Sequence, residues 1–349
     1  MSANAQQLMQ EGISSLLQGR NLERGEARAL MGAIMEGEAT AAQIGSMLTA
    51  LRIKGETVEE ITGFAEAMRG FGSRVSTENR RLLDTCGTGG SGIHKFNIST
   101  VSALISAAAG VRVAKHGNRS ASGRVGSADV LEALGVGIHL NAEQARRCLD
   151  SIGICFLFAQ IYHPSMKHAA APRRELGFRT VFNMLGPLTN PAGADRQLLG
   201  IYDREKTETV AAVLRELGSR RAMVVSSLEG LDEISISGPT RVSELRDGEI
   251  RTYEIRPADL GLQEHRLQDV LGGDAAENAA IIRSVLEGVL TPYRDIVLAN
   301  AGACIYVAGL ADSHAEGVRT AAETIDSGAA LRKLEQLTAL TKELQYVSG

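Results

Sequence analysis

The sequence predicts an α/β protein in which a small all-helical domain precedes a larger α/β domain with a mainly parallel central sheet flanked by helices. Three observations support this fold class. Residues 1–74 combine helical spacing of apolar residues with helix-capping pairs. From Arg81 onward, short apolar segments alternate with helical ones, which is typical of a parallel sheet. Residues 154–159 are apolar throughout, as a strand covered on both faces should be.

The N-terminal region has clear helix-start signals. Thr40 with Gln43, and Thr57 with Glu60, have the spacing of capping boxes, and an apolar helical face follows each pair. Glycines separate these segments, so we expect several short helices that each bury one face. The predicted division of the chain is a helical domain of residues 1–74, which helices from about 165–190 join, and an α/β domain of residues 78–349.

In the larger region, strands and helices are expected to alternate until a hairpin interrupts them. A strand around Leu83 leads into a glycine-rich loop, and a helix is expected over residues 99–109. Residues 234–256 predict a hairpin that turns at Asp247-Gly248, and helices return from about residue 276. The further predicted strands cover residues 111–114, 154–159, 198–202 and 222–226.

The bulk composition excludes several classes of protein. The chain has 349 residues, of which 44% are hydrophobic and 22% charged, and its formal net charge is −4 at pH 7. No global field therefore attracts nucleic acid or an anionic membrane, and we expect neither partner. The N-terminal residues lack the pattern of a signal peptide, and no apolar run is long enough to span a bilayer, so a cytoplasmic protein is expected. The 4 cysteines show no CxxC spacing, which argues against a zinc site.

The sharpest local signal is the glycine-rich segment Asp84–Gly92, directly after the first predicted strand. Its clustered glycines let the backbone bend tightly and turn N–H groups toward an anion. The run Asn97–Thr100 then opens a helix, whose N-terminus offers free N–H donors and a positive dipole. The segment matches neither a Walker A motif nor a GxGxxG fingerprint. It predicts a phosphate or pyrophosphate site, and the alternative is a plain connector before a helix.

A second polar segment, Lys115–Gly123, follows the next predicted strand and contains two fixed cations, a histidine, an amide and serine hydroxyls. Lysine and arginine neutralise phosphate charge, while hydroxyls and backbone N–H groups donate to phosphate oxygens. Loops that follow successive parallel strands lie at the carboxyl edge of the sheet, where open α/β folds bind ligands. Together the two segments favour phosphate binding over the alternative of a solvated surface loop.

Longer motifs, in order across most of the chain, carry a resemblance to a known family. They are GTGG (87–90), FNIST (96–100), KHGNRS (115–120), GSADVLEALG (126–135), HPSMK (163–167), PRR (172–174), FNMLGPLTNPA (182–192) and LDEI (231–234). These runs resemble the signatures of the anthranilate phosphoribosyltransferase family.

The resemblance implies an active site in the cleft between the two domains, in a homodimer. It also implies phosphoribosyl pyrophosphate and anthranilate as substrates, Mg²⁺ as cofactor and a role in tryptophan synthesis. The residues that it places at phosphoribosyl pyrophosphate are Gly87, Gly90, Ser91, Lys95, Asn97, Ile98, Ser99, Thr100, Lys115, His116, Gly117, Asn118, Arg119, Ser120, Ala121, Ser122, Gly123 and Ser127. Those that it places at anthranilate are Gly87, His116, Asn118, Tyr162, His163 and Arg173. Those that it places at magnesium are Ser99, Asp232 and Glu233.

Elementary chemistry supports two of these roles. Anthranilate is a flat carboxylate, so an arginine such as Arg173 is an expected anchor, although a helix-surface cation is the alternative and Arg174 is a rival. The adjacent carboxylates Asp232 and Glu233 repel one another unless a cation lies beside them, and hard oxygen ligands that bridge to phosphate suit Mg²⁺. Without the resemblance, this pair would be interpreted as ordinary solvated acids.

No residue is assigned as a general acid or base. The anthranilate amine is a neutral nucleophile, and its proton becomes acidic only as the new C–N bond forms. We therefore expect catalysis to consist mainly of positioning and of stabilising the departing pyrophosphate, with an oxocarbenium-like ribose and inversion at the anomeric carbon.

The sequence departs from the family pattern at two places. The family loop usually reads GTGGDG and is followed by TFNIST, whereas this chain has Ser91 and Lys95 in place of the Asp and the Thr. One carboxylate is lost and one cation gained, so we expect full rate at a lower free Mg²⁺ concentration than a typical relative needs. The stretch 122–126, SGRVG, also differs from the common SSKSG.

Two rival functions are weighed against this interpretation. A nucleoside phosphorylase shares the general fold, but its loop resembles KxSTGG and it leaves KHGNRS and Arg173 unexplained. A nucleic-acid-binding relative would need a basic strip, which the net charge of −4 and the lack of a Lys/Arg-rich tract oppose.

Overall fold

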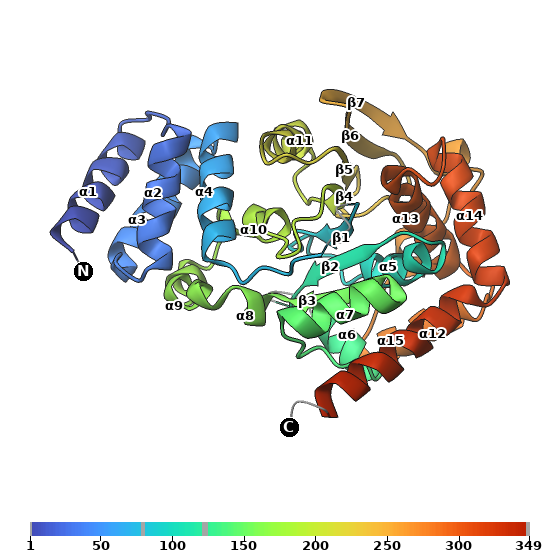
Figure 1. The fold of residues 1–349 in the computed structure, drawn as a ribbon. Helices are drawn as coiled ribbons and strands as arrows, with labels where there is room; N and C mark the ends of the chain where they lie inside the picture. The colour runs from blue at the N-terminus through green and yellow to red at the C-terminus, as the bar shows by residue number, and fades with distance from the viewer. Residues whose placement is uncertain (1, 78–80, 121–124, 347–349) are drawn as a thin grey trace.

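The computed structural model describes residues 2–77, 81–120 and 125–346. The helical layer at the N-terminus lies beside the sheet, with α10 between them and α9 below the N-terminal helices (Figure 1). Both predicted capping boxes are confirmed, because the Thr40 and Thr57 hydroxyls accept from the Gln43 and Glu60 N–H groups at 3.1 and 3.3 Å. The helices of this layer are α1 (Ala3–Leu17), α2 (Arg24–Met35), α3 (Ala41–Lys54) and α4 (Val58–Phe71).

One sheet organises the rest of the chain, and its strand order is β3-β2-β1-β4-β5-β6-β7 within the described residues. The pairs from β3 to β5 are parallel, and β6 and β7 add an antiparallel hairpin at one edge. The mainly parallel sheet is therefore confirmed. The strands are β1 (Leu83–Gly87), β2 (Val113–Gly117), β3 (Ile154–Phe158), β4 (Arg196–Gly200), β5 (Arg221–Ser227), β6 (Thr240–Arg246) and β7 (Glu249–Ile255).

Helices cover both faces of this sheet. Along β5, Met223 and Val225 join the core beneath α5 and α13, whereas Ala222 and Val224 join the core that continues into the N-terminal helices. This alternation is the period-two pattern of a strand buried on both faces. The remaining helices are α5 (Ile98–Ala108), α6 (Ser127–Ala133), α7 (Ala142–Ile152), α8 (Ala159–Tyr162), α9 (Lys167–Leu176), α10 (Phe182–Leu185), α11 (Thr207–Glu216), α12 (Ala275–Leu286), α13 (Pro292–Ala308), α14 (His314–Asp326) and α15 (Ala329–Tyr346).

The helical layer is packed onto the larger region through apolar and charged contacts. Ala169 of α9 and Phe182 of α10 belong to the same buried cluster as the cores of α2, α3 and α4. Arg24 of α2 pairs with Glu66 of α4 at 2.6 Å and with Glu216 of α11 at 3.4 Å. The buried cluster holds α9 and α10 against the N-terminal helices, and the Arg24 ion pairs join α2 to α4 and α11. The exact division at residues 74 and 78 stays a prediction.

Several predicted strand limits are wrong by a few residues, and one error has a clear cause. The strand expected at 111–114 is β2, Val113–Gly117, so Lys115 and His116 lie in a strand rather than in a solvated loop. Both side chains are buried. The first strand likewise extends to Gly87, into the segment that was expected to be a loop. A charged residue inside a strand breaks the apolar pattern from which strand ends are predicted.

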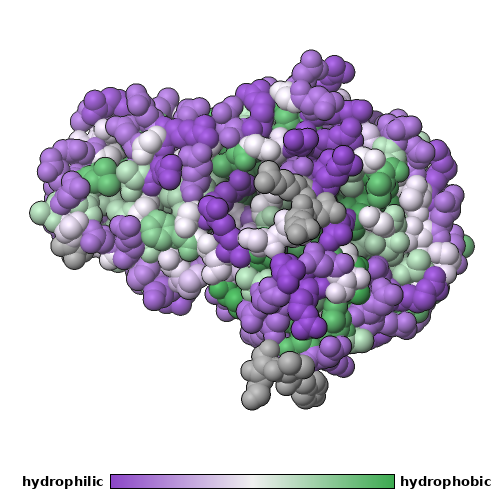
Figure 2. Space-filling view, viewed as in Figure 1, coloured by the Kyte–Doolittle hydropathy of each residue, from purple (hydrophilic) through white to green (hydrophobic). Residues whose placement is uncertain are grey.

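Hydrophilic residues cover most of the face shown in Figure 2, and hydrophobic ones lie scattered among them. Across the described ranges, no helix is both long and apolar enough to cross a bilayer.

Candidate functional site

The site is built where β1 and β4 end side by side. Gly87 and Gly200 are paired at these ends, and the chain that follows β5 passes directly over them. A Cβ atom on Gly87 would lie 2.5 Å from Oδ2 of Asp232, and one on Gly200 would overlap the Asp232 carbonyl group. Two glycines at matched positions therefore let Asp232 lie against the carboxyl edge of the sheet.

The glycine-rich segment closes over the same carboxylate. Gly89, Gly90 and Gly92 have φ values of 65°, 78° and 77°, which side-chain-bearing residues rarely adopt. The N–H of Gly89 donates to Oδ2 of Asp232 at 2.9 Å. The positive φ values thus explain why glycine occupies these positions, and the Gly89 N–H already faces a carboxylate.

Lys95 joins the two acids. Its Nζ lies 2.9 Å from Oδ1 of Asp232 and 2.7 Å from Oε1 of Glu233, and it donates to the Asp232 carbonyl oxygen at 3.1 Å. The side chains of Lys95, Asp232 and Glu233 are only 17%, 1% and 5% exposed. The interpretation of Asp232 and Glu233 as ordinary solvated acids is therefore wrong.

The electrostatics of this cluster follow from burial and from the ammonium group. Burial raises the pKa of Asp232, but Lys95 and the Gly89 N–H outweigh it and leave the pKa below its ordinary value. At Glu233 burial outweighs Lys95 and the pKa is raised. Burial lowers the pKa of Lys95, but the two carboxylates outweigh burial and raise it. The cluster thus favours a positive charge between the acids.

A second group of predicted residues meets at the start of α5. Lys115 is buried in β2, where its Nζ donates to the Thr85 carbonyl and, at 3.1 Å, to Oγ of Ser99. The hydroxyl of Thr100 is buried and has no hydrogen-bond partner among the described residues. Ile98 is fully buried, so only its backbone could reach a ligand. Lys115 and Ser99 therefore come together, as the phosphate interpretation requires.

Asp84 forms hydrogen bonds to residues next to this group, and no role for it was predicted from the sequence. Its carboxylate accepts from the His116 N–H at 3.0 Å and from Nδ2 of Asn190 at 2.8 Å. Burial raises its pKa to about 6, although these donors and Lys115 favour the charged form. Asp84 thereby ties β1, β2 and the segment after α10 into one network.

The segment after β2 is described only in part. Arg119 pairs with Asp129 and with Glu132 of α6 at 2.6 Å each, so its charge is already compensated by two carboxylates. A Cβ on Gly117 would lie 2.5 Å from Oγ of Ser127, which brings α6 close to the end of β2. The side-chain Oδ1 of Asn118 accepts from the Arg119 N–H at 2.8 Å. The candidates Ala121, Ser122 and Gly123 lie outside the described residues.

The residues expected near anthranilate differ in burial and in the groups that they contact. The rings of His116 and His163 lie 5.1 Å apart, and burial lowers both pKa values, that of His116 to about 3. Arg173 is half-buried and lies over the Phe182 ring at 4.8 Å, whereas Arg174 is exposed. Tyr162 is buried, and its hydroxyl donates to the Leu140 carbonyl, so it faces the core.

Family models of known proteins match this chain in two parts. The glycosyl transferase family, a/b domain, matches residues 79–331, and the glycosyl transferase family, helical bundle domain, matches residues 10–72. The anthranilate phosphoribosyltransferase of Brevibacillus brevis is 54% identical over 336 residues, which are 96% of this chain and 98% of that relative. The chain belongs to the anthranilate phosphoribosyltransferase family.

Solved structures of the anthranilate phosphoribosyltransferase family have the same fold. The enzyme from Thermus thermophilus matches with a TM-score of 0.90 and 43% identity, over 95% of this chain and 99% of that one. The enzyme from Saccharomyces cerevisiae in complex with PRPP and Mg matches with a TM-score of 0.88 and 28% identity, over 96% and 98% of the two chains. The family and the fold class expected from the sequence are both confirmed.

One basic residue beside the glycine-rich segment had no sequence signal. A Cβ on Gly90 would lie 3.1 Å from Nε of Arg179, and this guanidinium lies over the Tyr202 ring at 4.0 Å. Among the described residues, no carboxylate forms an ion pair with Arg179. A free cation therefore faces the glycine-rich segment, and only the fold brings it there.

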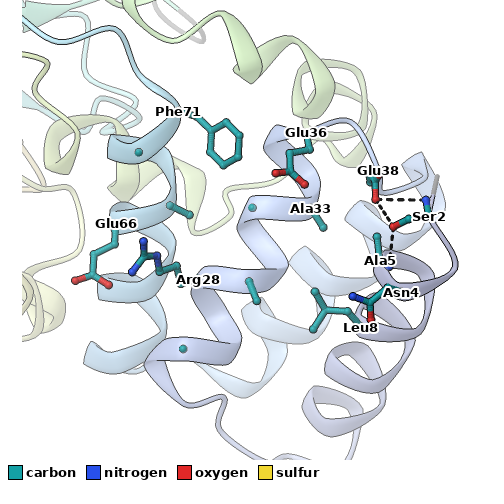
Figure 3. A pocket seen from close by; sticks show the side chains of 15 residues that line it. Ser2, Asn4, Ala5, Leu8, Arg28, Ala33, Glu36, Glu38, Glu66 and Phe71 are labelled. Atoms are coloured by element: carbon teal, nitrogen blue, oxygen red, sulfur yellow. Dashed lines mark hydrogen bonds between the residues drawn. The ribbon is translucent and has the colours of Figure 1, made fainter.

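A pocket of about 520 Å³ lies among α1, α2 and α4 of the helical layer (Figure 3). Small residues such as Gly25, Gly32 and Ala33 line it, with Arg28 and Glu66 at its side. Of the predicted substrate and metal residues that the structure describes, none lines this pocket.

Proposed function

We propose that this chain transfers the 5-phosphoribosyl group of phosphoribosyl pyrophosphate to the amine of anthranilate. The C1–O bond to pyrophosphate breaks, a C1–N bond forms, and the amine loses one proton, which gives N-(5-phosphoribosyl)anthranilate and pyrophosphate. This is a step of tryptophan synthesis. The observation that carries the proposal is the meeting of the glycine-rich segment with Lys95, Asp232 and Glu233 at one edge of the sheet.

The donor is proposed to bind between the two sheet-edge segments. The turned N–H groups after Gly87 and the N-terminus of α5 supply hydrogen-bond donors for a pyrophosphate. Lys115 and Ser99 lie together at that N-terminus, and the phosphate-binding set named from the sequence extends from here along the segment after β2. We place the donor phosphates on these groups because they combine backbone donors with positive charge.

The acid pair has the chemistry of a magnesium site. Asp232 and Glu233 supply hard oxygen ligands, and their Oδ1 and Oε1 atoms both face one cation, the Lys95 ammonium, at 2.9 and 2.7 Å. Across the described residues, no group of three or more His, Cys, Asp or Glu side chains could hold a metal ion. Two carboxylates alone suit Mg²⁺, which usually takes its other ligands from water and substrate phosphate. When bound, Mg²⁺ would neutralise charge on the departing pyrophosphate. Ser99 is the third proposed ligand.

The acceptor is proposed to bind near Arg173, whose guanidinium would anchor the anthranilate carboxylate. Burial lowers the pKa of His116 and of His163, so both imidazoles are neutral at pH 7. Neutral rings can hydrogen-bond to the acceptor without adding charge, which agrees with catalysis by positioning rather than by an acid or base. Gly87 and Asn118 complete the proposed contacts, and the burial of Tyr162 limits it to a supporting position.

We also propose that the chain acts in the cytoplasm as a homodimer, with residues 1–74 as the helical domain and residues 78–349 as the α/β domain. The resemblance of the full set of motifs supports each of these statements. Size-exclusion chromatography with light scattering would test the dimer.

The fluorescence of anthranilate provides the direct test of the reaction. With phosphoribosyl pyrophosphate and Mg²⁺ present, anthranilate fluorescence should fall and one pyrophosphate should appear for each anthranilate consumed. Omission of the donor should abolish both changes. Fluorescence that stays constant at saturating donor and Mg²⁺ would contradict the proposed function.

A further inference from the structure

Lys95 has the coordination of a bound cation. A lysine ammonium has three N–H donors, and here three oxygens surround it: Oδ1 and the carbonyl oxygen of Asp232, and Oε1 of Glu233. All three lie between 2.7 and 3.1 Å from Nζ. The ammonium therefore already has the two carboxylates that a divalent ion would need.

The backbone holds Lys95 in this position. Lys95 forms an isolated antiparallel bridge with Leu271, and the Gly272 N–H donates to the His94 carbonyl at 2.7 Å. Phe96, the next residue, is fully buried and packs edge-on against the Tyr293 ring at 5.1 Å. Residues on both sides are thus anchored, so the side chain reaches the acids from a fixed base.

Charge and size exclude joint occupancy. The two carboxylates together carry a charge of about −2, and the Lys95 ammonium reduces the charge of the three-residue cluster to about −1. The cluster therefore attracts a second cation more weakly. Mg²⁺ also requires oxygens at about 2.0–2.1 Å, closer than the ammonium allows. A divalent ion can bind both carboxylates only after Nζ has moved away.

We propose that Lys95 is a built-in cation that occupies the position between Asp232 and Glu233, so that the protein without donor takes up no divalent ion there. The proposal rests on the proposed function in one respect: the pyrophosphate of the donor offers Lys95 a competing anion and releases the acids. Metal then reaches this edge of the sheet together with the donor. The lower Mg²⁺ requirement expected from the sequence stays a separate prediction.

The test measures binding of Mn²⁺, as a probe for Mg²⁺, to the full-length protein without donor, by the loss of the free-ion electron paramagnetic resonance signal. Lys95→Met should bind Mn²⁺ about ten-fold more tightly than the unaltered protein, or better, because it removes the competing charge. Lys95→Arg should bind Mn²⁺ as weakly as the unaltered protein, because it keeps the positive charge. The double variant Lys95→Met/Glu233→Gln should lose the gain, which locates the ion at the acid pair.

Lys206→Met is the matched control, because Lys206 Nζ lies 3.4 Å from the buried carboxylate of Glu56, whereas the ammonium that pairs with Asp232 and Glu233 is that of Lys95. This variant should bind Mn²⁺ like the unaltered protein. Thermal melting checks that each variant folds. If Lys95→Met does not fold, Lys95→Gln replaces it in the Mn²⁺ measurement.

Equal Mn²⁺ affinity in the unaltered protein and in the Lys95→Met or Lys95→Gln variant would overturn the proposal. The fluorescence assay separates this result from failure of the function. If anthranilate is still consumed, only the role of Lys95 falls; if it is not consumed at saturating Mg²⁺, the proposed reaction falls as well.

Discussion

The Asp232 carboxylate fills the space that a side chain at position 87 would need, because a Cβ atom on Gly87 would lie 2.5 Å from Oδ2 of Asp232. The same oxygen accepts from the Gly89 N–H at 2.9 Å, so the glycine-rich segment and the acid pair are fixed relative to each other. This relationship sets the distance between the proposed phosphate-binding amides and the proposed metal ligands.

Gly87→Ala should therefore displace Asp232 and lower activity more than stability. Because a displacement of about 1 Å in a catalytic group can cost about a hundred-fold in rate, we expect a loss of kcat/KM of that order. The measurement is anthranilate fluorescence loss over a range of Mg²⁺ concentrations. Gly25→Ala is the control, since Gly25 lies in α2 and an added Cβ would meet no atom of the described residues within 4 Å. Equal activity of the two variants would contradict the argument.

Arg173→Ala should weaken the use of anthranilate selectively. Loss of a charge-assisted hydrogen bond of about 1.5–3 kcal/mol raises the anthranilate KM by about ten- to a hundred-fold. The KM for the donor should change little. Arg174→Ala is the matched control, because Arg174 is the exposed neighbour on the same helix. If Arg174→Ala has the larger effect on anthranilate, the acceptor anchor is assigned to the wrong residue.

The pH dependence of stability should carry a contribution from Asp84. Its pKa is raised by burial to about 6 from an ordinary value of 3.8, so the folded protein holds this proton more tightly than the unfolded chain. Protonation of Asp84 therefore adds about 3 kcal/mol to the free energy of unfolding below pH 4, and this stabilisation is lost as the pH rises to about 6.

Asp84→Asn removes this titration, and urea unfolding at several pH values measures it. The difference in unfolding free energy between the unaltered protein and Asp84→Asn should shift in favour of the variant between pH 4 and pH 6. A difference that does not change with pH would show that Asp84 titrates alike in both states.

The elements that the sequence predicted well are those with local causes. The hairpin turns at Asp247-Gly248, as expected, and both residues have positive φ values of 53° and 83°, which suit a tight two-residue turn. The capping boxes and the apolar run of β3 likewise depend only on neighbouring residues. Local propensity was sufficient to place these elements.

The predictions that failed involve contacts between distant segments. Lys115 was assigned to a loop because a lysine rarely lies in a buried strand, yet Ser99 and the Thr85 carbonyl compensate its ammonium. No local pattern shows that Lys95 reaches Asp232, because 137 positions separate them. The motifs named these residues, but only the folded sheet shows how they pair.

Arg179 provides the last test, because it faces the glycine-rich segment without any signal in the sequence. Its Nε would lie 3.1 Å from a Cβ on Gly90, and no carboxylate within the described part of the chain pairs with it. We expect a donor phosphate to gain a charge-assisted hydrogen bond from this group, so Arg179→Ala should raise the KM for phosphoribosyl pyrophosphate by about ten- to a hundred-fold. Arg179→Lys should recover part of the loss because it keeps the charge but not the planar fork. The anthranilate KM should stay nearly constant, which distinguishes this variant from Arg173→Ala. An unchanged donor KM would mean that stacking of Arg179 on Tyr202 is its whole role.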